Sequence, residues 1–243
     1  MKPTPLLTFG SLFAGIGGFD LGFERAGMVC KWQVEIDDYA NKVLSRHWPN
    51  VHRERDIREC RKHNLESVDV MCGGYPCQDI ANSSSTGTGL DGERSGLWRE
   101  YKRLIRCLRP RFVVVENSAN LLNRGFGRLL RDLATSGYDA EWRVFSAYEF
   151  GAPHRRERLY IVAYSNKEYG AKGLGAEQNR TPKIFRGNPN TRLPVWLQAA
   201  SEFAGMDDGV SGRTYRDRVG CVGNAVVPQI AELIGNGIVE LVG

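Results

Sequence analysis

Cys77, in the segment GGYPCQ at 73–78, is a candidate catalytic nucleophile. This segment follows the apolar run 68–72, which is typical of a buried strand, and Pro76 stiffens the turn just before Cys77. The thiolate is the attacking form of a cysteine, so a positive setting or a helix N-terminus would activate Cys77 by lowering its pKa. An ordinary buried cysteine is the better interpretation of the five others, Cys30, Cys60, Cys72, Cys107 and Cys221.

An acid and two arginines lie beside other candidate strands. Glu116 closes the apolar run 112–115, where loss of water would raise its carboxyl pKa and let it donate a proton. The alternative is a charge that simply surfaces where the strand ends. Arg156 and Arg158 alternate onto one face ahead of the strand 159–164, which suits a carboxylate or phosphate. Taken alone, these arginines are more typical of a solvated run of charges, but the strand that follows and the other candidate sites favour the functional interpretation.

A glycine-rich turn indicates close approach of the backbone to a ligand. The segment FAGIGG at 13–18 follows the apolar strand 6–13 and opens a helix. Glu35 comes about 20 residues later, at the end of the strand 32–36, which is the offset of a carboxylate that holds ribose hydroxyls. The spacing is G-x-G-G, so a nicotinamide dinucleotide is not favoured. Turn glycines with an unrelated surface glutamate would give the same pattern.

The elements that must position these residues alternate between strand and helix. This alternation predicts a mostly parallel sheet with helices on both faces, whose ligands lie beyond the carboxyl ends of the strands. In the first helix, Phe19, Leu21, Phe23 and Ala26 are the expected core positions. Strands are expected at 6–13, 32–36, 68–72, 112–115 and 159–164, and helices at 19–26, 39–48, 97–108, 126–133 and around 230–238.

Composition limits the class of protein. A chain of 243 residues, 42% hydrophobic, suits one α/β domain with at most a small second lobe. It has neither an apolar run long enough to cross a membrane nor a secretory signal, and its six cysteines form no C-x-x-C pair. We therefore expect a soluble, reduced, intracellular protein without a zinc site or a disulfide framework. The net charge of +5 permits a polyanionic partner without proving one.

Together, these segments resemble the DNA (cytosine-5)-methyltransferase family of bacterial or phage type, in the family's motif order. Two features depart from the family pattern: His154 replaces a glutamine, and the variable region at 166–221 is short, with 213–218 the nearest match to its usual R-E motif. The departures affect target specificity more than chemistry. The matching motifs are F-x-G-x-G at 13–17, the acids Glu35 and Asp56 (with Ile57), P-C-Q at 76–78, R-x-x-L at 94–97, E-N at 116–117, Q-x-R-x-R at 154–158 and G-N-x-V-x-P at 223–228.

The resemblance implies a Rossmann-like methyltransferase fold with a mostly parallel twisted sheet and a small irregular second lobe. Residues 1–165 and 222–243 would form the catalytic domain, and 166–221 a reduced target-recognition lobe. Cys77 would add to C6 of a flipped cytosine, Glu116 would protonate or hydrogen-bond N3, and Arg156 and Arg158 would orient the base. The product would be 5-methylcytosine in DNA, as in restriction–modification systems.

The resemblance also assigns a cofactor, S-adenosyl-L-methionine, and a partner, double-stranded DNA. The segment 79–95 would close over the flipped base. No metal and no membrane are expected, and we expect a monomer in the cytoplasm of a prokaryotic or phage-infected cell. The implied cofactor-binding residues are Phe13, Gly15, Gly17, Glu35, Asp56, Ile57, Pro76, Leu97, Asn224 and Val226. The implied nucleic-acid-binding residues are Gln78, Ser83, Arg94 and His154.

Two alternatives remain, and a third is not supported by the sequence. An RNA (tRNA) cytosine-5 methyltransferase would use the same residues, and a short variable lobe suits recognition of RNA shape. A catalytically silent nucleic-acid-binding relative would need neither Cys77 nor Glu116. A nicotinamide oxidoreductase fails on the glycine spacing and leaves the P-C-Q segment unexplained. On the basic helix, Arg99, Lys102 and Arg103 fit phosphate contacts and a solvated face equally well.

Overall fold

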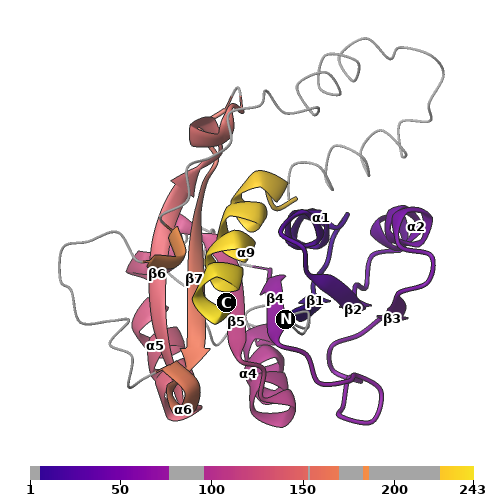
Figure 1. Ribbon diagram of the computed structural model, residues 1–243, viewed down its shortest axis with the longest axis horizontal. Coiled ribbons are helices and arrows are strands. Elements are labelled where there is room, and N and C mark those ends of the chain that lie inside the picture. Colours follow the sequence, from indigo (N-terminus) through magenta and orange to yellow (C-terminus); the bar gives the residue numbers. More distant parts are fainter. Residues whose placement is uncertain (1–5, 77–95, 153, 170–182, 186–224) are drawn as a thin grey trace.

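The computed structural model describes residues 6–76, 96–152, 154–169, 183–185 and 225–243. Its centre is a seven-stranded sheet with the order β3-β2-β1-β4-β5-β7-β6 (Figure 1). Neighbouring strands are parallel except where β7 pairs antiparallel with β5 and β6. The mostly parallel sheet is therefore confirmed. The strands are β1 (Thr8–Leu12), β2 (Val29–Val34), β3 (His52–Glu54), β4 (Val70–Gly74), β5 (Phe112–Ser118), β6 (Tyr138–Ser146) and β7 (Glu157–Ser165).

Helices cover both faces of this sheet. On one face, α1 (Gly18–Arg25) packs beside the C-terminal α9 (Pro228–Val242), with α2 (Asp38–His47) next to α1 (Figure 1). On the other face lie α4 (Leu97–Leu108) and α5 (Phe126–Thr135). Shorter helical segments are η2 (Ala119–Asn123), η3 (Ala147–Phe150), α6 (Asn166–Tyr169) and η5 (Lys183–Phe185).

The helix α4 has the bounds expected from its sequence. Its buried side chains recur every three or four residues, which gives the apolar stripe of an amphipathic helix. The stripe faces the sheet, and the charged residues face outward. Pro110 then prevents the helix from continuing. The buried positions are Trp98, Tyr101, Leu104, Ile105 and Leu108.

Two strands and one core position depart from the expectations. The sequence pattern predicted neither β3, which has three residues, nor the edge strand β6, whose charged residues interrupt a regular alternation of buried positions. Leu21 was wrongly expected in the core and is 37% exposed, whereas Phe19 and Phe23 are buried. Two residues along a helix is about 200° of rotation, so Leu21 points away from the Phe19 face.

Glycines let α9 lie directly against α1. A Cβ at Gly18 would meet the Val226 carbonyl oxygen at 2.3 Å, and one at Gly22 would meet the Ala231 Cβ at 2.5 Å. The C-terminal segment therefore returns to the sheet beside the glycine turn. Most of 166–221 lies outside the described residues, so the division into a catalytic domain and a second lobe stays a prediction.

In the central strands, successive side chains alternate between the two cores. Phe112 and Val114 of β5 pack on the α1–α9 side, and Val113 and Val115 pack on the α4–α5 side. The next two residues, Glu116 and Asn117, are polar and continue the alternation, so they diverge to opposite faces at the carboxyl end of the strand.

The described residues bear on the expectations about cysteines, membrane-spanning helices and metal sites. Cys30, Cys60 and Cys72 are free and buried, and Cys107 is half-buried. No helix within these ranges has the length and apolar character to cross a membrane. Within the same ranges, histidine, cysteine and acidic side chains form no group of three that could hold a metal ion.

Candidate active site

The glycine turn after β1 has a backbone that few other sequences could adopt. Phe13, Gly15 and Gly17 have positive φ values of 52°, 57° and 89°. A Cβ at Gly15 would meet nothing within 4 Å, whereas one at Gly17 would meet the Trp48 ring at 2.3 Å. The turn is thus packed against the protein at Gly17 and open at Gly15, where a ligand could approach the main chain.

Glu35 lies opposite this turn, at the end of the neighbouring strand. Its carboxylate accepts hydrogen bonds from the Gly15 N–H (2.7 Å) and the Asp37 N–H (2.8 Å), one on each oxygen. Each oxygen retains a further acceptor site for a ligand hydroxyl. The next residue, Ile36, is 59% exposed and offers an apolar surface beside the acid. Sequence reasoning missed Ile36, although an apolar residue after a strand-end acid was a usable signal.

The expected adenine-side pair is less open. The Asp56 carboxylate accepts from the backbone N–H and the guanidinium of Arg58, which hold its pKa below the usual value. Ile57 is buried in the core, and its carbonyl accepts from Arg103. Both follow β3, which pairs with β2, so they lie on the same side of the sheet edge as Glu35. Their role in cofactor binding stays a prediction.

Glu116 occupies a confined place at the end of β5. It is 7% exposed, and a Cβ at the facing Gly74 would meet its Oε2 at 2.5 Å. Its Oε1 is 3.1 Å from Arg158 Nε, an ion-pair contact. Burial raises the pKa of Glu116, and the positive charges of Arg158 and Arg156 oppose that rise. Glu116 is thus a buried carboxyl group whose acid form is favoured by burial and whose ionised form is favoured by the two arginines, next to the strand that leads toward Cys77.

The two arginines predicted to share a face have different partners. Arg158, on β7, pairs with Glu116, whereas Arg156 Nη1 donates to the Ala225 carbonyl at 2.5 Å. Arg156 therefore ties the segment ahead of α9 to the site. Burial and the neighbouring Arg158 lower the pKa of Arg156. The preceding residue Arg155, like His154, is exposed at this rim.

Asn117 holds the segment that leads to the candidate nucleophile. It is 1% exposed, and its Nδ2 donates to the Tyr75 carbonyl at 3.1 Å. The Tyr75 ring is buried and contacts that of Trp98, with centroids 5.6 Å apart. The chain is therefore held at Tyr75, two residues before Cys77, by the hydrogen bond from Asn117 and by the packing of the Tyr75 ring on Trp98. Sequence reasoning gave a role to the glutamate of the E-N pair and overlooked the asparagine.

The remaining predicted site residues divide into two groups. Pro76 is exposed, Leu97 and Phe13 pack at the edge of the α4–α5 core, and Val226 packs against the α1–α9 core. Five residues lie outside the described ranges, so their placement stays a prediction; they are Cys77, Gln78, Ser83, Arg94 and Asn224.

A family comparison bears on this arrangement. The model of the C-5 cytosine-specific DNA methylase family matches residues 7–198, which include the glycine turn, Glu35, Glu116 and both arginines. The chain belongs to this family.

Individual relatives agree with this assignment. The Type II methyltransferase M2.BsuMI of Bacillus subtilis is 38% identical over 161 residues, covering 63% of this chain and 41% of the relative. M.HhaI of Haemophilus parahaemolyticus is 30% identical over 186 residues, covering 75% and 54%. The chain thus spans about half the length of these curated relatives.

Solved structures confirm the Rossmann-like methyltransferase fold. The Entamoeba histolytica methyltransferase EhMeth superposes with a TM-score of 0.69 at 16% identity, covering 98% of this chain and 99% of that one. A protein encoded within an E. coli prophage gives 0.66 at 18% identity, covering 97% and 99%.

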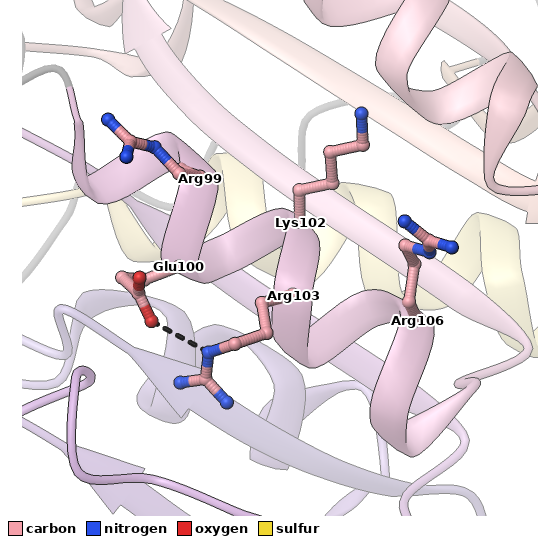
Figure 2. Close-up of a pocket in the computed structure, with 5 residues that line it drawn as sticks. All are labelled: Arg99, Glu100, Lys102, Arg103 and Arg106. Carbon is pink, nitrogen blue, oxygen red and sulfur yellow. Dashed lines mark hydrogen bonds and ion pairs between the residues drawn. The ribbon is translucent and has the colours of Figure 1, made fainter.

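The outer face of α4 carries the basic side chains whose role, phosphate contact or solvated face, the sequence did not decide (Figure 2). Lys102 forms an ion pair with Asp132 of α5. Arg103 pairs with Glu100 (2.7 Å) and donates to the Ile57 and Cys60 carbonyls. These two cations therefore join α4 to its neighbours. Arg99 and Arg106, the other arginines of the shallow pocket, are exposed.

Because Asn117 fixes the segment before the predicted nucleophile, its loss should slow the expected catalysis more than it weakens cofactor binding. For Asn117→Ala we expect kcat to fall about 10- to 100-fold with the KM for the methyl donor nearly unchanged, since a buried carbonyl loses its donor and the segment shifts. Steady-state methylation kinetics would measure this. Asn120→Ala, on exposed η2, is the control. An equal fall in both variants would refute the assigned role.

Proposed function

We propose that this chain is an S-adenosyl-L-methionine-dependent DNA cytosine-5 methyltransferase that forms 5-methylcytosine. One observation supports this most strongly: the buried Glu116, paired with Arg158 and enclosed by Gly74, lies beside the strand that leads to Cys77. Membership of the methylase family supports it independently. The matched relatives are Type II methyltransferases, and we extend to this chain a place in a restriction–modification system.

The residues present fit the proposed cofactor. The open backbone at Gly15 and the Glu35 carboxylate would hold the ribose, and exposed Ile36 would pack against the adenine. Asp56 and Ile57 would border the adenine, and Val226 would close the pocket from the C-terminal side. When bound, S-adenosyl-L-methionine supplies an electrophilic methyl group.

The chemistry requires a nucleophile because C5 of cytosine is poorly reactive. The Cys77 thiolate would add to C6, forming a C–S bond and placing electron density on C5. Glu116 would donate its proton to N3, so the ring accumulates no negative charge. Arg158 would hold the base while keeping Glu116 in place. After C5 is methylated, a base such as a bound water takes the C5 proton, the C6–S bond breaks to release the Cys77 thiolate, and N3 returns its proton to Glu116, which restores the ring and the enzyme.

The target atom is hidden within a stacked duplex, so the cytosine must rotate into this site. The predicted contacts of Gln78, Ser83, Arg94 and His154 with DNA belong to this proposal. Exposed His154 and Arg155 lie at the same rim as the Glu116–Arg158 pair, because they precede the start of β7 at Glu157 by only a few residues. Their placement supports a nucleic-acid partner at the carboxyl edge of the sheet.

Incubation with methyl-labelled cofactor separates the alternatives. We expect label in double-stranded DNA, recovered as 5-methylcytosine after digestion to nucleosides. Label in tRNA instead would favour the RNA methyltransferase. Cofactor binding by calorimetry with no transfer to varied DNA or to tRNA would favour the silent relative and refute the proposed activity.

Glu35 should contribute to cofactor affinity through both ribose contacts and the glycine turn. For Glu35→Gln we expect S-adenosylmethionine affinity to fall about 10- to 100-fold, because an amide offers one acceptor oxygen where the carboxylate offers two. Isothermal titration calorimetry measures this directly. Glu54→Gln on β3 is a matched acid on the neighbouring strand, and its affinity should stay within about twofold of wild type. Unchanged affinity in Glu35→Gln would remove Glu35 from the cofactor site.

A further inference from the structure

A row of polar side chains crosses the first three strands beneath the candidate cofactor site. Ser11 of β1, Gln33 of β2 and Arg53 of β3 are register partners, so they lie next to one another on the face covered by α1. Asp20, in the first turn of α1, contacts the row from above. Proposed catalysis uses none of these four residues, which we call the Asp20 row.

The Asp20 row is continuously hydrogen-bonded. The Asp20 carboxylate, which is fully buried, accepts from Ser11 Oγ at 3.1 Å and from Gln33 Nε2 at 2.8 Å. Gln33 Oε1 accepts from Arg53 Nε (3.0 Å) and Nη2 (2.8 Å). Because a guanidinium only donates, the amide orientation of Gln33 is fixed and its NH₂ group must face Asp20. Arg53 Nη2 also donates to the Trp48 carbonyl at the end of α2.

The Asp20 row lies close to the residues that would hold the cofactor. Ser11 precedes Phe13 by two residues, and Gln33 precedes Glu35 by two, which is about 7 Å along a strand. Asp20 follows Gly17 by three residues, on the helix that the glycine turn opens. The row therefore joins the three segments whose relative placement sets the Gly15–Glu35 contact.

We propose that Asp20 is a positioning residue for the S-adenosyl-L-methionine site, holding the ends of β1 and β2 and the start of α1 in the arrangement that the cofactor requires. This inference rests on the proposed function. Buried polar groups that are fully hydrogen-bonded fix one arrangement, and losing one partner leaves the others unsatisfied. Asp20 thus acts on the cofactor through the glycine turn and Glu35, without touching it.

The charge of Asp20 makes this arrangement sensitive to pH. Burial raises the pKa of Asp20 to about 6, despite hydrogen bonds from Gln33, Ser11 and Cys30 that oppose the rise. The ionised form can accept from all three donors, whereas a proton on one oxygen displaces a donor. If the cofactor favours the fully bonded arrangement, its binding must lower the pKa of Asp20 and release protons near pH 6, by linkage.

Other titratable or charged groups also lie around Asp20. The Cys30 thiol of β2 and the Cys72 thiol of β4 face it, and burial raises the pKa of each far above neutrality. Glu24, on the same helix, accepts a hydrogen bond from Trp48 Nε1 at the surface, and Arg53 is joined to the row through Gln33. Within the Asp20 row, Asp20 is the carboxyl group whose pKa burial raises to about 6.

Calorimetric titration with S-adenosylhomocysteine tests the proposal. For Asp20→Asn we expect affinity at pH 7 to fall roughly tenfold. At pH 6, titration in buffers of different ionisation enthalpy should show proton release in wild type and little in Asp20→Asn. The control is Asp69→Asn, which removes a carboxylate bonded to Thr8 at the opposite end of β1. It should keep both wild-type affinity and proton release.

A milder variant keeps the test decisive if Asp20→Asn does not fold. Ser11→Ala removes a hydrogen bond that lowers the pKa of Asp20, so proton release should move to higher pH, with affinity reduced severalfold. Wild-type affinity and an unshifted proton release in both variants would overturn the positioning role. Absence of any cofactor binding by wild type would instead refute the proposed function.

Discussion

Replacing Cys77 with serine should abolish methyl transfer while leaving cofactor affinity within about twofold of wild type. A serine hydroxyl is scarcely ionised at neutral pH, whereas a cysteine thiol forms its nucleophilic thiolate readily. Because the proposed reaction cannot begin without addition to C6, we expect kcat to fall at least about 10⁴-fold, as for other lost nucleophiles. Transfer of labelled methyl groups to DNA measures kcat, and calorimetry measures cofactor affinity.

The covalent step can be captured independently of turnover. A duplex carrying 5-fluorocytosine at the target has no C5 proton to lose, so the Cys77–C6 bond should persist and appear as an adduct in peptide mass spectrometry. Cys107→Ser, a half-buried thiol on α4, is the control and should form the same adduct at a wild-type rate. An adduct on another cysteine, or full activity in Cys77→Ser, would contradict the mechanism.

The elements that position the site could be predicted because each has a local signature. The apolar stripe of α4 and the apolar runs of β1, β4 and β5 can each be recognised within a single short stretch of sequence. The edge strand β6 has no such signature. It pairs with a strand, β7, along one edge only, and charged residues interrupt its alternation of buried and exposed positions. Its place depends on pairing with β7, a contact between separate segments.

The candidate site shows the same division between local pattern and distant contact. The offset between the glycine turn and Glu35 is a spacing in one βαβ unit, and the hydrogen bond between Gly15 and Glu35 matches it. The bond from Asn117 to Tyr75 and the enclosure of Glu116 by Gly74 join residues about 40 positions apart. Neither has a sequence signal beyond a polar residue at a strand end and a glycine opposite it.

Charge at the surface was the least predictable feature. Arg99, Lys102 and Arg103 look alike in sequence, but only the last two are engaged by Asp132, Glu100 and nearby carbonyls. A long cationic side chain can reach several partners, and which it finds depends on the packing of α5 and of the segment after β3. The same holds for Arg156, whose bond to Ala225 depends on the return of the C-terminal chain.

Glu116→Gln should lower kcat about 100-fold and remove one limb of the pH profile. Glutamine keeps the volume and can still donate a hydrogen bond to N3, but it cannot transfer a proton, and proton transfer from a positioned acid is typically worth about 100-fold or more. Burial raises the pKa of Glu116, so the acid form persists to higher pH than in water. Wild-type kcat/KM should therefore fall as pH rises through that raised pKa and Glu116 loses its proton, whereas the variant should show no such fall.

The direction of this limb distinguishes Glu116 from Cys77. Cys77 must lose a proton to attack, so its titration raises activity with pH, and only a required acid produces a decline. Glu141→Gln, which alters another buried carboxyl in the same sheet on β6, should retain both limbs and nearly full kcat. If Glu116→Gln kept the declining limb, a different acid would protonate N3. The ion pair with Arg158 would then serve to hold β5 and β7 together at the edge of the site rather than to tune a proton donor.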